Sequence, residues 1–149
     1  MPKPLREDDA LLAAARDAAR RAYAPYSRFR VGAALAGPFG IICGCNVENA
    51  SFGMTICAER GAILAAVAAG HRAFDRLAIA LPDSPADAPA TSFMPCGACR
   101  QVLAEFVGPE FPVLIDGIGE YRFAELFPHP FVLPPARASA AGPARCDPT

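Results

Sequence analysis

Three cysteines in two short segments constrain this chain more than any other feature. Residues 55–60 read TICAER and contain Cys57, and residues 95–101 read PCGACRQ and contain Cys96 and Cys99. Three thiolates suit a soft ion with tetrahedral coordination, such as Zn²⁺. A structural zinc site usually has four protein ligands, whereas a catalytic site keeps one position for water. Because no fourth Cys or His stands at matching spacing beside either segment, the sequence favours a catalytic zinc.

Two charged residues beside Cys57 fit this chemistry. A Cys-x-Glu followed by Pro-Cys-x-x-Cys is the pattern of zinc-dependent nucleobase deaminases. In that pattern Glu59 takes a proton from the water at the metal and delivers it to a ring nitrogen and then to the leaving amine. Arg60 is a candidate donor to the thiolate sulfurs, which would offset their negative charge. The alternatives are an ordinary first-turn glutamate and a solvated helix arginine.

The composition limits the class of protein. A length of 149 residues predicts one domain with a real core. The net charge is −1 and no basic block stands out, so we expect no nucleic-acid partner. Apolar runs such as residues 62–69 are too short to span a bilayer, so no membrane partner is expected either. The N-terminal sequence differs from a secretory signal, which predicts a cytoplasmic protein with reduced cysteines.

The order of predicted elements is helix, hairpin, helix, strand, helix, strand, strand. This order predicts an α/β domain with a mixed sheet, in which the hairpin is antiparallel and the helical crossovers are parallel. We assign the domain to residues 1–133 and expect the Pro/Ala-rich tail, residues 134–149, to be disordered. The predicted elements are a helix over 8–23, strands 30–36 and 41–47, a helix capped by Thr55 and ending near 69, a strand over 75–81, a surface loop over 82–91, a helix starting at Pro95, strands 113–115 and 119–123, and a helical turn over 124–127.

Beyond the zinc motif, the chain resembles the small, homotetrameric cytidine deaminases. The matching segments are PYSRFRVGAAL (25–35), GCNVENASFG (44–53), CAER (57–60), 95–102 and 125–131. The resemblance implies a three-layer α/β/α domain with a mixed sheet of about five strands and one Zn²⁺ per chain. It also implies hydrolytic deamination of cytidine and deoxycytidine to uridine and deoxyuridine, with release of ammonia, in pyrimidine salvage. In that reaction a zinc-bound hydroxide attacks C4 of the base.

The same resemblance implies a role for each matching residue. Asn46 and Glu48 would bind the ribose 3′-hydroxyl, and Phe29 would pack against the pyrimidine. The backbone at Cys57 and Ala58 would read the edge of the base. Neighbouring subunits of the homotetramer would complete one another's pockets through three residues, Ala50, Phe52 and Phe131.

Some features depart from the family or leave alternatives open. Met94 stands where a small residue often precedes Pro-Cys-Gly, and the 82–91 loop is rich in proline. Both bear on substrate preference, and the nearest rival function is deamination of another aminopyrimidine such as blasticidin S. A polynucleotide-editing deaminase would need a basic and aromatic surface to bind the strand, so the composition disfavours this function. A non-enzymatic zinc module would need His71 or His129 as a fourth ligand. The three remaining cysteines are not at ligand spacing: Cys43, Cys45 and Cys146.

Overall fold

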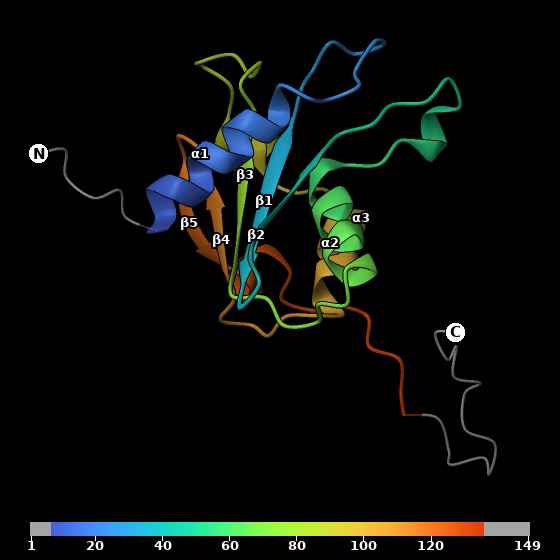
Figure 1. Cartoon of the computed structure of the whole chain (residues 1–149), viewed down its shortest axis with the longest axis vertical. Helices are drawn as coiled ribbons and strands as arrows, with labels where there is room; N and C mark the ends of the chain where they lie inside the picture. The colour runs from blue at the N-terminus through green and yellow to red at the C-terminus, as the bar shows by residue number, and fades with distance from the viewer. Residues whose placement is uncertain (1–6, 136–149) are drawn as a thin grey trace, which may run out of the picture.

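The computed structural model describes residues 7–135, which form a five-stranded sheet with helices on both faces (Figure 1). The predicted tail from residue 134, which includes Cys146, lies outside the described residues except for its first two positions. Two short 3₁₀ turns lie in the connections, at Phe52–Met54 and Ala90–Phe93. The elements are α1 (Glu7–Ala19), β1 (Gly32–Gly37), β2 (Gly40–Cys45), α2 (Ala58–Ala68), β3 (Arg76–Ala80), α3 (Gly97–Ala104), β4 (Pro112–Ile115), β5 (Gly119–Arg122) and α4 (Phe123–Leu126).

The sheet combines antiparallel hairpins with parallel crossovers. Its strand order is β2-β1-β3-β4-β5. β1 is antiparallel to both β2 and β3, β3 is parallel to β4, and β4 is antiparallel to β5. β2 and β3 therefore run in the same direction on either side of β1, and α2 connects them. This topology confirms the predicted mixed sheet.

The helices form two layers around the sheet. α1 packs on one face over β1, β2 and β3, and α2 packs on the other face against β1 and β2, with α3 beside it (Figure 1). Small residues allow these layers to approach closely, and Gly32 shows this well because a Cβ there would lie 1.9 Å from the carbonyl oxygen of Ala15 in α1. The arrangement confirms the predicted three-layer domain.

The main core lies between the sheet and α2 and α3 and includes Leu35, Ile63, Leu77, Ile79, Leu103, Val113, Ile115 and Phe123. None of the described helices combines the length and apolar content that a bilayer crossing requires.

Three strand ends meet at one end of the sheet. Gly32, the first residue of β1, lies opposite Cys45, the last of β2, and Ala80, the last of β3. The connections that leave β2 and β3 lead to the N-termini of α2 and α3. Open α/β sheets bind ligands beyond the carboxyl ends of their strands. The topology therefore places a candidate site at this end.

The predicted boundaries needed correction at several elements. α1 ends at Ala19 instead of near residue 23, because the Tyr23 N–H donates to the carbonyl of Asn46 at 3.0 Å instead of continuing the helix. The first strand begins at Gly32 instead of residue 30, because the N–H groups of Arg30 and Val31 donate to side chains and not to a strand partner. The second strand ends at Cys45, and the last ends at residue 122 because the next residue starts α4.

Candidate metal centre and adjoining cavity

The two cysteine segments begin the two helices on the same face of the sheet. Cys57 is the N-cap of α2, and Cys96 is the N-cap of α3. The predictions that Thr55 caps the first helix and that Pro95 is the first residue of the second were therefore wrong, by two residues each. Both cap residues have extended backbone and no side-chain cap hydrogen bond, so the two thiols are available for other contacts.

The three cysteine sulfurs lie together. The Sγ atom of Cys96 is 3.8 Å from that of Cys57 and 3.4 Å from that of Cys99, and all three lie within 4.8 Å of one another. Tetrahedral zinc with Zn–S bonds of about 2.3 Å separates its sulfurs by about 3.8 Å. The spacing and the softness of the donors both fit Zn²⁺. Within residues 7–135, no His, Asp or Glu side chain joins this group.

Arg60 provides positive charge next to the sulfurs. It lies in the first turn of α2, and its Nη2 donates to Cys57 Sγ at 3.5 Å and to the carbonyl of Thr55 at 3.3 Å. Its Nε is buried without a hydrogen-bond partner, so the Nε–H group remains available as a donor near the thiols. The contact with Cys57 raises the pKa of Arg60, which keeps the guanidinium charged.

The thiols share protons unequally. A hydrogen bond from Cys99 is the largest influence that lowers the pKa of Cys57, to about 5, and Arg60 adds to this effect. The same hydrogen bond, together with burial, raises the pKa of Cys99. Cys57 is thus a thiolate at neutral pH before any metal binds. A preformed thiolate favours metal capture, because zinc ligands must be deprotonated.

Glu59 is buried next to the metal group. Its residue is 6% exposed, in the first turn of α2. Burial, with a smaller contribution from the neighbouring Cys57 thiolate, raises the pKa of Glu59 to about 7. A carboxyl group whose pKa lies near neutrality can both accept and release a proton, as a general acid–base group must.

A cavity of about 440 Å³ opens beside the cysteines and Glu59. It is bounded by the starts of α2 and α3, by residues 27–31, and by the connections that follow β2 and β3. Its lining combines a mainly apolar wall with a few polar groups, which is typical of small-molecule sites. The lining residues are Ser27, Phe29, Val31, Asn46, Glu48, Thr55, Cys57, Ala58, Glu59, Ile79, Leu81, Phe93, Met94 and Cys96.

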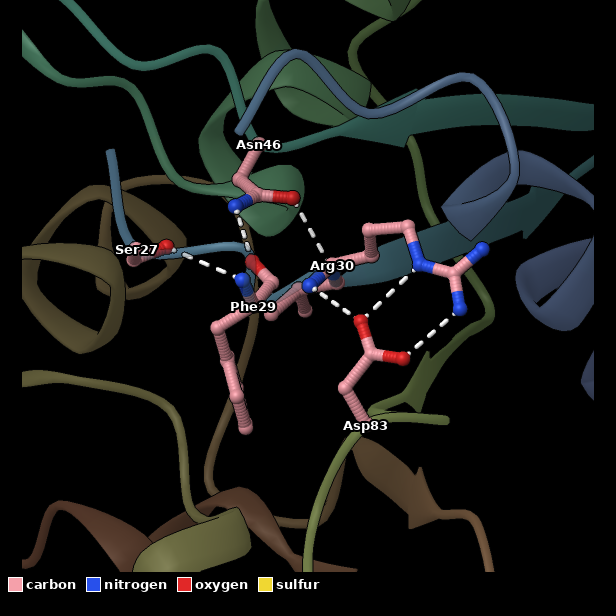
Figure 2. A network of polar contacts seen from close by, with 6 residues as sticks. Ser27, Phe29, Arg30, Asn46 and Asp83 are labelled. Atoms are coloured by element: carbon pink, nitrogen blue, oxygen red, sulfur yellow. Dashed lines mark hydrogen bonds and ion pairs between the residues drawn. The ribbon is translucent and has the colours of Figure 1, made fainter. Parts of the chain in front are cut away.

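Asn46 fixes the part of the cavity wall that carries Phe29. The Asn46 side chain is almost fully buried, and its Nδ2 donates to the carbonyl of Phe29 at 2.8 Å. Its Oδ1 accepts from the N–H of Val31, also at 2.8 Å (Figure 2). The amide therefore bridges the two residues that flank Arg30. Each end of an asparagine amide can make one further hydrogen bond, so both ends keep capacity for a ligand.

Glu48 holds the preceding turn. Its carboxylate accepts from the N–H groups of Tyr26 and Ser27, at 2.8 and 3.2 Å, and from the Ser27 hydroxyl. The Ser27 hydroxyl lowers the pKa of Glu48, so the group is ionised at neutral pH. The Ser27 hydroxyl oxygen in turn accepts from the N–H of Phe29 at 3.0 Å (Figure 2). Glu48 therefore supports the cavity wall as well as lining the cavity.

The structure brings most of the predicted site residues together, but not all of them. Ala50, Phe52 and Phe131 do not line the 440 Å³ cavity, and each is exposed in the single chain. Phe52 lines an adjoining cavity of about 310 Å³, together with Tyr26 and Thr55. The backbone of Phe131 is held by Gln101 of α3 through hydrogen bonds of 3.0 and 3.1 Å.

The remaining cysteines and histidines lie apart from the metal group. Cys43 and Cys45 lie in β2, and the ring of His71 stacks on Phe39 with a centroid distance of 4.3 Å. Neither His71 nor His129 joins the three sulfurs. These positions argue against the closed structural site that a fourth histidine ligand would make.

Several cavity residues carried no signal in the sequence. Four residues that line the cavity are Thr55, Ile79, Leu81 and Phe93. The sequence indicates only secondary structure for the first three and nothing for Phe93. Their only signal was proximity in sequence to a strand end or to a metal segment. Met94, noted above as a departure from the family pattern, is a lining residue.

Comparison with known proteins agrees with this geometry. Residues 5–115 match the family model described as the cytidine and deoxycytidylate deaminase zinc-binding region. A cytidine deaminase of Sporosarcina psychrophila is 44% identical over 126 residues, covering 81% of this chain and 88% of its own. One of Mycobacterium tuberculosis is 43% identical over 121 residues, covering 80% and 85%.

Solved structures show the same fold. The crystal structure of cytidine deaminase from Burkholderia pseudomallei matches with a TM-score of 0.71 and 43% identity, over 82% of this chain and 97% of that one. The Mycobacterium tuberculosis structure matches with a TM-score of 0.72 and 37% identity, over 87% and 100%. With the family match spanning most of the sequence, the chain belongs to the cytidine and deoxycytidylate deaminase family.

Proposed function

We propose that this protein catalyses the hydrolytic deamination of cytidine and deoxycytidine, giving uridine and deoxyuridine and releasing ammonia. The observation that carries the proposal is the position of the buried Glu59 carboxyl beside three clustered sulfurs, both at the wall of one cavity. The relatives named cytidine deaminase support this substrate class.

The three sulfurs of Cys57, Cys96 and Cys99 would hold Zn²⁺, leaving one coordination position for a water molecule. When bound, Zn²⁺ lowers the pKa of that water and supplies the nucleophile for attack on C4 of the base. Arg60 compensates the negative charge of three thiolates, which would otherwise make the water less acidic.

Glu59 moves the protons of the reaction. Its carboxylate would accept a proton from the attacking water and donate it to N3 of the ring. It would then take the proton of the new C4 hydroxyl and pass it to the amine, which leaves as ammonia when the C4–N bond breaks and the C4 carbonyl forms. A pKa raised to about 7 suits both halves of this cycle. The burial of Glu59 keeps bulk water from competing for the proton.

The rest of the cavity would orient the nucleoside. Phe29, Cys57 and Ala58 line the cavity. The ring of Phe29 would pack against the pyrimidine, and the backbone at Cys57 and Ala58 would read the edge of the base. Asn46 and Glu48 line the cavity with hydrogen-bonding capacity for the ribose 3′-hydroxyl. Each would do this in addition to the backbone contacts that it makes in this structure.

The complete site would be shared between subunits of a homotetramer. Phe52 and Phe131 are 74% and 68% exposed, as are the neighbours Val132 and Leu133 at 75% each. Large apolar groups exposed together are typical of an interface. Ala50, Phe52 and Phe131 would then complete the cavity of a neighbouring copy.

A metal site made of unpaired thiols fits the reducing cytoplasm, where the protein would act in pyrimidine salvage.

The test is the loss of cytidine absorbance in the ultraviolet, with metal analysis of the same sample. We expect turnover with one zinc per chain, and retention of zinc and fold with near-complete loss of turnover, by about 10³-fold or more, for Glu59→Gln. Glu105→Gln, at the exposed end of α3, is the matched control. Undiminished activity of Glu59→Gln would remove Glu59 from the mechanism.

Two further measurements separate the rival functions. Faster turnover of blasticidin S than of cytidine would assign the site to a different aminopyrimidine. Zinc without turnover of either compound would indicate a structural metal site. Sedimentation that shows an active monomer would contradict the shared site.

A further inference from the structure

A bidentate ion pair joins two segments that are far apart in sequence. The Nε and Nη2 atoms of Arg30 donate to Oδ2 and Oδ1 of Asp83, at 2.9 and 2.7 Å. The backbone N–H of Arg30 also donates to Asp83 Oδ2, at 2.8 Å (Figure 2). One carboxylate therefore holds both the side chain and the backbone of Arg30. The Arg30 guanidinium lowers the pKa of Asp83 to about 2, so the carboxylate is ionised at physiological pH.

Both partners of this pair belong to segments that line the candidate active-site cavity. Arg30 lies between Phe29 and Val31, which both line the cavity. Asp83 lies two residues after Leu81, another lining residue. It lies near the start of the connection that follows β3 and in the proline-rich 82–91 loop. This connection returns to the cavity at Phe93 and Met94, just before the cysteines of α3.

The two sides of the peptide group between Phe29 and Arg30 are fixed in different ways. Asn46, at the end of β2, holds the carbonyl of Phe29 and the N–H of Val31, which ties the segment to the α2 side of the cavity. Asp83 holds the intervening N–H and ties the same segment to the connection that leaves β3. In Figure 2 the Asn46 amide and the Asp83 carboxylate reach the segment from different sides. Phe29 is therefore positioned by both walls of the cavity.

We propose that Arg30 and Asp83 form a positioning pair that fixes the separation of these two walls, and thereby sets how tightly the site holds the pyrimidine ring. The inference rests on the proposed function, in which Phe29 packs against that ring. Neither side chain lines the cavity, so both act through their neighbours. The 82–91 loop thereby becomes part of the binding site without contributing a side chain to the 440 Å³ cavity.

The chemistry of the pair suits this role. A planar guanidinium with two parallel hydrogen bonds fixes direction as well as distance, whereas a lysine supplies only a point charge. The two side chains are 46% and 24% exposed, and exposed ion pairs contribute little to global stability. Loss of the pair should therefore change binding more than folding.

The chain contains a matched control. Arg16 and Asp116 form the same bidentate pair, through Nε and Nη2, between α1 and the end of β4. Their side chains are 55% and 23% exposed, close to the values for Arg30 and Asp83. Neither residue lines the candidate cavity. Asp83→Asn and Asp116→Asn thus make the same chemical change at two ion pairs of similar exposure, only one of which joins the cavity walls.

The experiment measures kcat and KM for cytidine, and the dissociation constant of uridine by calorimetry, on the zinc-loaded proteins. We expect Asp83→Asn to raise KM and the uridine dissociation constant about 5- to 10-fold while kcat stays within about twofold. Asp116→Asn should leave all three values unchanged. Arg30→Lys keeps the positive charge but cannot make the bidentate contact, so it should raise KM and the uridine dissociation constant by a smaller factor.

Each other outcome has a defined meaning. Equal constants for Asp83→Asn and Asp116→Asn would overturn the positioning pair, as would an equal loss of kcat and thermal stability in both variants. Should Asp83→Asn fail to fold, Arg30→Lys makes the same comparison, and an unchanged KM there overturns the pair. A wild-type protein that does not deaminate cytidine would instead overturn the proposed function.

Discussion

Arg60 links Cys57, the first of the three clustered cysteines, to the chain that precedes it. Its Nη2 atom lies 3.5 Å from Cys57 Sγ and 3.3 Å from the carbonyl oxygen of Thr55. The helix begins directly after these two contacts, at Ala58. One guanidinium group therefore orients the thiolate and closes the turn that delivers it, so that the charge and the position of Cys57 depend on the same side chain.

Replacement of Arg60 should weaken metal binding more than folding. In Arg60→Gln the pKa of Cys57 should rise, because the neighbouring cation is lost. We expect the zinc affinity at neutral pH to fall about 10- to 100-fold, as is typical when a group that orients a metal ligand is removed. Competition with a zinc chelator measures this affinity.

The matched control for this change lies at the other end of the same helix. Arg72 donates to the carbonyls of Val67 and His71, at 2.9 Å each, beyond the end of α2. Arg72→Gln removes the same charge far from the thiols and should leave zinc affinity unchanged. Equal affinities for the two variants would show that Arg60 does not support the thiolate.

Glu59 should give the metal-free protein a specific pH dependence. Burial raises its pKa from 4.5 to about 7, so the folded chain binds this proton more tightly than the unfolded chain does. Its favourable contribution is complete below a pH of about 4.5 and is lost as the pH rises through about 7. Glu59→Gln is neutral throughout and lacks this loss.

Denaturant unfolding in the presence of a chelator tests this dependence. Relative to wild type, Glu59→Gln should gain stability as the pH rises from about 5 to about 8, by up to about 3 kcal/mol. Glu105→Gln, which replaces an exposed carboxyl, is the matched control and should not reproduce this gain. A constant difference for Glu59→Gln as well would mean that its pKa is not raised.

The sequence was sufficient to predict the metal group and the type of fold. The spacing of Cys57, Cys96 and Cys99 relative to the predicted helix starts requires two helix N-termini to meet. Continuous apolar runs indicate β3 and β4, and apolar residues at helical spacing indicate α3. Such features depend on local patterns, which a single sequence displays directly. The helix starts themselves were misplaced, because Thr55 and Pro95 have the stronger intrinsic preference for caps and first turns.

Contacts between distant segments were beyond the reach of local patterns. Arg30 and Asp83 are separated by 53 residues, and neither occurs in a pattern that suggests the other. The same holds for the Asn46 amide, whose polar character suggested a ligand but not its two backbone partners near Phe29. The contacts of Asp83 and Asn46 with the N–H groups of Arg30 and Val31 make the first strand begin later than predicted, so one missed network accounts for both the missed contacts and the misplaced strand start.

Gly44 should be intolerant of any side chain. A Cβ at this position would lie 2.3 Å from the backbone nitrogen of Ala62 and 2.4 Å from the carbonyl of Ala58 in α2. Because both atoms are backbone, Gly44→Ala must displace the helix that carries Cys57. We expect a loss of about 3 kcal/mol in the free energy of unfolding, at the upper end for overpacking, with reduced zinc affinity.

Gly53 is the control for this substitution. A Cβ there meets no atom within 4 Å, so Gly53→Ala should change the free energy of unfolding by less than about 0.5 kcal/mol. Urea titration of the zinc-loaded proteins measures both values. A small effect at Gly44 would mean that α2 can move away from the sheet at low cost.

Gln101 should control the position of Phe131. The Nε2 of Gln101 donates to the Phe131 carbonyl at 3.0 Å, and its Oε1 accepts from the Phe131 N–H at 3.1 Å. The aromatic side chain itself is 68% exposed. Gln101→Ala removes both hydrogen bonds and leaves the segment free to move, which raises the entropic cost of ordering Phe131 against a neighbouring copy.

If Phe131 completes a neighbouring site, Gln101→Ala should weaken subunit association and lower kcat/KM, by about 10-fold each. Sedimentation over a range of protein concentrations measures the first effect, and cytidine turnover at the same concentrations measures the second. Glu105→Ala, one turn further along α3, should change neither. Because activity and assembly depend on the same segment, raising the protein concentration should restore part of the activity of Gln101→Ala. Activity that stays low in fully assembled protein would place the role of Gln101 within its own subunit instead.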